Sequence, residues 1–204
     1  MIWRRGAPIL LLALLCASCA EDRVTKNMAR LNSLAYEQLR NCYQTVYDRG
    51  DFEAARRRLP ADYQTASTEQ ETDPSIARDP EIAAVLGART RLEECRNTFF
   101  DKVRTDTPGL LPTYYTLMAY AEASLFEVMQ KKKSWGDHVR DVKELQRQSA
   151  LDIIELLRKS SGGLSKDPKD VKIYREQLDK AKESYDQTQK ALTTMRRPIM
   201  TRPN

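Results

Sequence analysis

Apolar residues recur at steps of three and four along most of the chain, the spacing that places side chains on one face of an α-helix. One series covers residues 24–46, and a second covers residues 85–103 after the helix-start pattern Asp79-Pro80-Glu81. A third series covers residues 112–160 and a fourth covers residues 171–195. We therefore predict an all-α fold: an antiparallel helical bundle with long, coiled-coil-like helices.

The series over residues 171–195 is an unbroken heptad pattern. Its apolar seam consists of Val171, Tyr174, Leu178, Ala181, Tyr185, Thr188, Leu192 and Met195. Such a seam is buried either within one chain or against a second copy, so an oligomer formed through residues 171–195 is one expectation. The helix is expected to stop at Arg196-Arg197-Pro198, which leaves a basic tail over residues 197–204.

Two segments interrupt the helical pattern. Residues 60–79 are polar, contain proline and lack helical periodicity, so we expect a surface loop that follows a short helix over residues 52–58. Within the third series, Gly136 is unfavourable in a helix interior by about 1 kcal/mol. The series is therefore either one helix about 73 Å long or two helices that fold back near Gly136.

The first residues have the order of a secretory signal peptide. Arg4 and Arg5 precede a short apolar run over residues 9–15, and small residues follow it. A membrane-spanning helix needs about 20 apolar residues, and this run is shorter. We expect residues 1–18 to be a removed signal peptide and residues 19–204 to form one exported helical domain.

The stretch Cys16-Ala17-Ser18-Cys19 resembles the bacterial lipoprotein box, although Cys16 stands where that box usually has Leu. The resemblance implies that Cys19 is lipidated and attaches the protein to a membrane. With Ala20 after the cysteine it also implies the outer membrane, on its periplasmic face. The alternative is ordinary cleavage after Ala20, which would release a soluble periplasmic protein.

Outside the signal region the cysteines are Cys42 and Cys95. A pair of cysteines in an oxidising compartment is typical of a disulfide, although two separately buried thiols are the alternative. Closing a loop of roughly 50 residues stabilises a fold by about 4 kcal/mol in the chain-entropy estimate.

Charge and composition narrow the possible partners. Removal of residues 1–18 takes away two arginines and no acid, so the net charge falls from +5 to +3. A nucleic-acid partner would need a concentrated basic face, so we expect none. A solvated face is expected where Lys132, Arg140, Lys143 and Arg147 lie, and a contact strip for an anionic polymer is the alternative.

Candidate catalytic chemistry is sparse. His138 is the only histidine and stands in no recognised catalytic motif, so we expect a residue at the rim of its helix and neither a metal site nor a cofactor. Tyr114, Tyr115 and Tyr120 are expected in the core and helix seams, with an aromatic-ligand or peptide groove as the alternative.

These features predict a non-enzymatic cell-envelope lipoprotein that acts as a helical scaffold or interaction protein for another envelope protein. The first alternative is a soluble periplasmic binding module or an inhibitor of an exported enzyme. An envelope hydrolase that uses carboxylates alone is the last alternative.

Overall fold

The computed structural model describes the backbone of residues 7–159 and 167–200, and the side chains of residues 26–156 and 167–195. Within these ranges the chain is helical, and strand-like pairing is limited to one isolated bridge between Ile76 and Ser134. The long helices are α1 (Ala7–Tyr47), α4 (Asp79–Asp106), α5 (Leu111–Met129), α6 (Trp135–Lys159) and α7 (Pro168–Met200). The short ones are η1 (Gly50–Phe52), α2 (Glu53–Arg56), η2 (Tyr63–Thr65), α3 (Thr68–Glu71) and η3 (Pro108–Leu110). The all-α prediction is confirmed.

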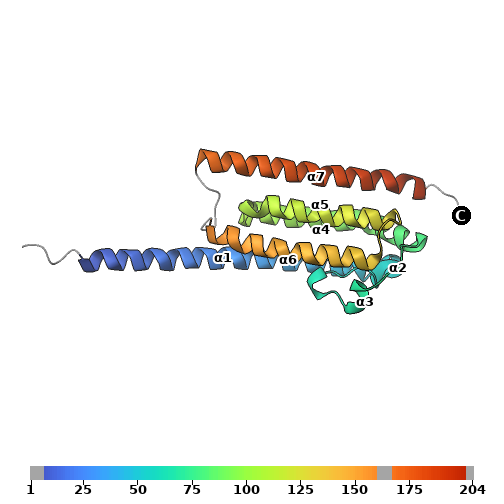
Figure 1. Ribbon diagram of the computed structural model, residues 1–204, viewed down its shortest axis with the longest axis horizontal. Coiled ribbons are helices and arrows are strands. Elements are labelled where there is room, and N and C mark those ends of the chain that lie inside the picture. The colour runs from blue at the N-terminus through green and yellow to red at the C-terminus, as the bar shows by residue number, and fades with distance from the viewer. Residues whose placement is uncertain (1–6, 160–166, 201–204) are drawn as a thin grey trace, which may run out of the picture.

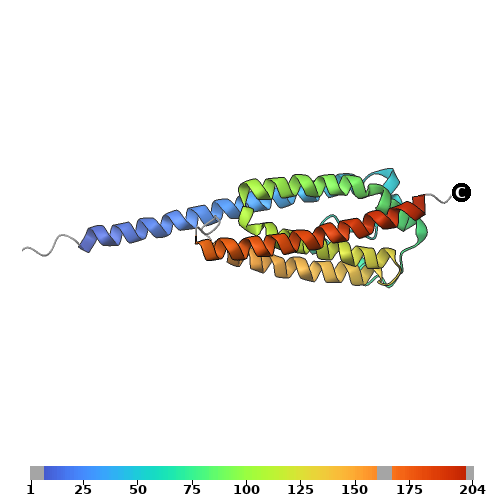
Figure 2. The same cartoon turned by 90° about the horizontal axis from the view of Figure 1, so that it is seen from above.

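The long helices lie side by side along one axis (Figure 1). α1 packs against α4, and α5 packs against both α6 and α7. Successive helices α4, α5 and α6 alternate in direction, whereas α7 runs parallel to α5 on the outside of the bundle (Figures 1 and 2). The N-terminal part of α1 extends beyond the other helices at the end where α6 finishes and α7 begins (Figures 1 and 2).

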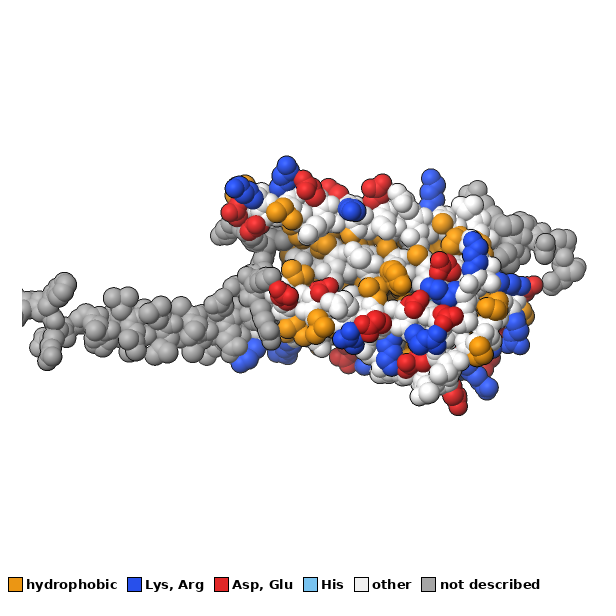
Figure 3. All heavy atoms as spheres, in the orientation of Figure 1, with side chains coloured by type: hydrophobic (Ala, Val, Ile, Leu, Met, Phe, Trp, Pro, Cys, Tyr) orange, Lys and Arg blue, Asp and Glu red, His pale blue; other side chains and the backbone are white. Residues whose placement is uncertain are grey.

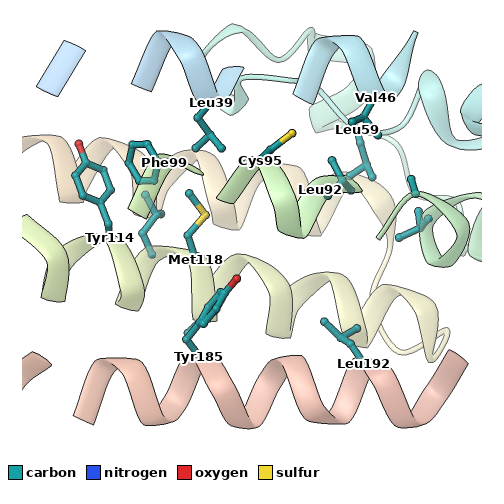
Figure 4. Close-up of a cluster of buried hydrophobic side chains, with 14 of the residues drawn as sticks. Leu39, Val46, Leu59, Leu92, Cys95, Phe99, Tyr114, Met118, Tyr185 and Leu192 are labelled. Atoms are coloured by element: carbon teal, nitrogen blue, oxygen red, sulfur yellow. The ribbon is translucent and has the colours of Figure 1, made fainter. Parts of the chain in front are cut away.

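The predicted apolar faces form the core (Figure 4). Leu39 of α1, Leu92 of α4 and Met118 of α5 are buried at their meeting line. The heptad seam of α7 is filled within the chain, because Tyr185 and Leu192 are also buried in this core. Burial of these side chains against neighbouring helices is the main source of stability in such a bundle.

The disulfide between Cys42 and Cys95 is confirmed. It joins α1 to α4 with a Cα–Cα distance of 5.8 Å and spans 53 residues of sequence. Each cysteine lies on the apolar face of its own helix, so the antiparallel packing of α1 on α4 brings the two sulfurs together.

The chain reverses direction between α5 and α6. Lys131 adopts a left-handed conformation with φ of 62°, and α6 begins at Trp135. The alternative of two helices is therefore correct. Gly136 does not cause the break, because it lies in the first turn of α6, where its N–H donates to the Asp73 carbonyl at 2.8 Å.

Residues 60–79 are more ordered than the polar composition predicted. They contain η2 and α3, and α3 begins with a reciprocal capping pair between Ser67 and Gln70. Asp62 and Ala77 are buried. The segment lies mostly at the surface, as expected, but its short helices were not predicted, because polar side chains that cap short helices give no hydrophobic periodicity.

Two helix boundaries also differ from expectation. The short helix expected over residues 52–58 is divided into η1 and α2. α7 continues to Met200, past Pro198, where the sequence predicted its end.

Candidate functional site

An open groove runs between α6 and α7, with α5 as its floor. Its volume is about 860 Å³. Figure 3 shows hydrophobic side chains gathered along this face, between α7 and the helices next to it. The floor residues from α5 are Pro112, Thr113, Thr116, Ala119, Tyr120 and Ala123.

Small side chains account for the width of the groove. Ala119 and Ala123 lie on the floor, while Ala181 and Ser184 of α7 and Ser149 of α6 line its sides. Ala123 and Ser184 are exposed, so the helix backbones are accessible to a close approach at these positions, whereas Ala119, Ser149 and Ala181 are buried. Small residues four apart on α5 are visible in the sequence, but this groove was not predicted from them.

Larger apolar side chains add contact area to the groove. Tyr120 is 45 % exposed and Leu156 is 37 % exposed, and both line it. The expectation that Tyr114 and Tyr115 are core residues is confirmed, since both are buried. Tyr120 instead lies at the surface, as the alternative of a peptide groove requires.

The two walls of the groove carry different charges. Asp152 and Glu155 stand on the α6 wall, whereas Lys180 stands on the α7 wall. Gln148 of α6 donates a hydrogen bond to Asp152 Oδ1 at 3.2 Å, which holds that carboxylate along its own helix. The surface is therefore polarised across its width.

A smaller cavity of about 60 Å³ lies inside the bundle. Arg96, 1 % exposed, lines it and donates to Glu122 Oε1 at 2.6 Å and to the Tyr185 hydroxyl at 3.0 Å. Burial opposes ionisation of Arg96, but Glu122, Tyr43 and Tyr185 together outweigh this effect and raise the pKa of the guanidinium. The cavity has room for about two water molecules, so it is too small for an organic cofactor.

His138 is wholly buried, and its predicted position at the rim of a helix was wrong. It shares the inner face of α6 with Trp135, Val139 and Val142. Its Nδ1 lies 3.0 Å from the Ser124 hydroxyl, and its Nε2 lies 2.9 Å from the Tyr63 hydroxyl. Burial, together with the charge of Lys133, lowers the pKa of His138 to about 3. The ring is therefore neutral at pH 7.

The pair of Ser124 and His138 has the residue types of a nucleophile and its base. Ser124 is only 3 % exposed, and its hydroxyl also accepts a hydrogen bond from Lys133 Nζ at 3.1 Å. A nucleophile must reach its substrate, and this hydroxyl is enclosed by the fold. The pair is consistent with a structural polar cluster.

The candidate anionic strip is engaged in local ion pairs. Arg140 pairs with Asp137, Lys143 pairs with Glu71 at 2.6 Å, and Arg147 pairs with Glu144 at 2.6 Å. Lys132 is exposed and lies in the turn before α6, not on its helical face.

The lipidation candidate Cys19 falls within the range of α1, but its side chain lies outside the described residues. Among the residues that the structure does describe, no helix has a stretch both long enough and apolar enough to cross a bilayer. In that same part of the chain, no cluster of three or more His, Cys, Asp or Glu side chains is placed to hold a metal ion.

Comparison with protein-family models, with curated proteins and with solved structures finds no significant match.

Proposed function

We propose that this protein is a non-enzymatic lipoprotein of the cell envelope that binds another envelope protein through the surface of its helical bundle. The observation that carries the proposal is the groove between α6 and α7, which offers an apolar floor on a disulfide-linked scaffold. Grooves between helices are established sites for peptide and protein segments.

The N-terminal sequence supports the location. Cys19 follows a short apolar run and stands in the lipoprotein-like box. Cleavage before Cys19 would remove residues 7–18 of α1 and leave Cys19 at the start of the helix that leads into the bundle. Acyl chains on Cys19 would attach this end to the periplasmic face of the outer membrane, because each buried methylene contributes about 0.8 kcal/mol. The groove, on the flank of the bundle, would then face the periplasm.

The test of the anchor compares the wild-type protein with Cys19→Ala in intact cells. We expect metabolic palmitate to label the wild type and the wild type to fractionate with membranes. Cys19→Ala should carry no label and move to the soluble periplasm, or be cleaved after Ala20 instead. A wild-type protein that is unlabelled and fully soluble would contradict the anchor and support the free periplasmic binding module.

A further inference from the structure

We propose that the groove between α6 and α7 binds an amphipathic helix of a partner protein, with a basic edge of that helix against α6 and an acidic edge against α7. This inference rests on the proposed function and names the class of partner. It is argued from the shape of the groove, its apolar floor and the charges on its two walls.

The shape fits a helix of about three turns. The floor extends along α5 from Pro112 to Ala123, which corresponds to about 17 Å at the helical rise. Ala123 is small and exposed, so a helix backbone can approach α5 closely at this point of the floor. Ala119 and Ala181 are also small, but they are already buried in the core of the bundle. An extended peptide would leave its backbone hydrogen-bonding groups unpaired over this floor, whereas a helix satisfies them internally.

The apolar contacts come from two exposed side chains at different positions along the groove. Tyr120 stands on the floor and Leu156 stands on the α6 wall. On an occupying helix, apolar residues at steps of three and four would face both of them. This is the pattern by which an amphipathic helix is recognised in a groove.

The charges set the direction in which the occupant lies along the groove, because its apolar face already fixes its rotation about its own axis. Asp152 on α6 attracts lysine or arginine, and Lys180 on α7 attracts aspartate or glutamate. The same helix in the reversed direction would bring like charges together on both sides. Charge complementarity of this kind chooses among partners that have the same apolar face.

The test uses a displayed library of amphipathic helices of about 14 residues, with a fixed apolar face and with each edge varied between Lys and Glu. The target is the purified mature protein, in lipid nanodiscs if it carries the lipid and free in solution if it does not. We expect selection to enrich helices with Lys on one edge and Glu on the other. The double variant Asp152→Lys with Glu155→Lys should invert the preference on the α6 side, while Glu94→Lys, on the exposed surface of α4, should leave it unchanged.

A second variant tests whether the selected helices bind in the groove. Ala123→Trp fills the floor and should weaken the selected helices by about tenfold or more, which corresponds to at least 1.4 kcal/mol. Ala83→Trp, at an exposed alanine of α4, is the matched control and should leave binding unchanged. Enrichment that ignores the edge charges, equal effects of the two tryptophans, or no enrichment at all would overturn the inference.

Analytical sedimentation of the same proteins tests whether a second copy of this chain occupies the groove instead. A dimer that Ala123→Trp dissociates and Ala83→Trp does not would assign the groove to a second copy and overturn the proposed partner. The palmitate experiment is independent of these outcomes: selective helix binding by an unlabelled protein would leave the groove inference standing and remove the anchor.

Discussion

Gly136 determines how closely the segment after α3 approaches α6. A Cβ atom added at this position would lie 2.7 Å from the backbone N and O of Asp73. Both of these atoms belong to the main chain, so the clash cannot be relieved by a side-chain rotation. A glycine in the first turn of α6 is thus required by tertiary packing, although it lowers intrinsic helix propensity.

We predict that Gly136→Ala lowers the free energy of unfolding by about 1–3 kcal/mol, because the backbone at Asp73 must move. Gly87→Ala is the matched control: that glycine lies within α4 and an added Cβ would meet nothing within 4 Å. The control should raise stability by up to about 1 kcal/mol through helix propensity. Urea unfolding of the three proteins measures both effects, and equal effects of the two alanines would contradict the close approach.

His138 makes stability sensitive to mild acid. Its pKa is lowered from 6.5 to about 3 in the folded protein. Below pH 6.5 the unfolded chain binds a proton that the folded chain does not bind, so the free energy of unfolding falls as the pH drops toward 3. The limiting slope is about 1.4 kcal/mol per pH unit for one group.

The single histidine gives one imidazole Cε1–H signal in an NMR spectrum of the folded protein. We predict that this signal does not titrate between pH 7 and about pH 5, because the folded ring stays neutral. Over the same range, the loss of stability should be present in the wild type and absent in His138→Gln. A titration midpoint between pH 6 and 7 in folded protein would contradict the buried, neutral ring.

At the scale of helices, the disulfide fixes α1 to α4 along the line where both bury their apolar faces. We predict that Cys42→Ser with Cys95→Ser lowers the free energy of unfolding by about 4 kcal/mol, because the unfolded chain regains the freedom of a long loop. The circular-dichroism spectrum should stay helical, since Leu39 and Leu92 still pack at this interface.

The measurement is urea unfolding with and without a reductant. Reductant should destabilise the wild type by a similar amount and leave the double serine variant unchanged. Free thiols that react with an alkylating agent in unreduced, folded wild-type protein would contradict the disulfide.

The helices and their buried faces were predictable because each face repeats along the sequence. Leu39 and Leu92 were placed correctly from spacing alone, and the disulfide was predicted from two cysteines in a chain that we expect to be exported. The burial of His138 could also have been predicted, since residues 135, 138, 139 and 142 share one helical face. The polarity of the imidazole favours a position at the rim, but the position of the residue on its helix decides its burial.

The order of residues 60–79 and the groove were not predictable in the same way. Arg58 pairs with both Asp73 and Glu81, and the Gln64 side chain donates to the Lys143 carbonyl at 2.9 Å. These contacts join residues that are far apart in the chain and leave no periodic signal. The groove likewise depends on the separation of α6 from α7, and spacing within either helix does not determine that distance.

At the scale of the whole molecule, the proposed anchor and the proposed binding surface occupy different places. The N-terminal part of α1 extends from one end of the bundle, and the groove lies along its flank (Figures 1 and 3). Among the described side chains of α1, Ala35 is the first that is buried, and Met28 is partly buried against the core. Among the side chains that the structure describes in α1, those that pack in the bundle therefore begin at Met28.

We predict that a chain beginning at Lys26, exported behind a separate cleavable signal peptide, folds with the melting temperature of the full mature protein. The physical reason is that every buried contact described for α1 lies at or after Met28. Leu39→Ala in the same shortened chain is the positive control, and its buried cavity should reduce stability by about 2–5 kcal/mol. Thermal melts followed by circular dichroism measure both. A shortened chain that melts as early as its Leu39→Ala variant would show that residues 19–25 belong to the bundle and that the anchor and the body are not separable.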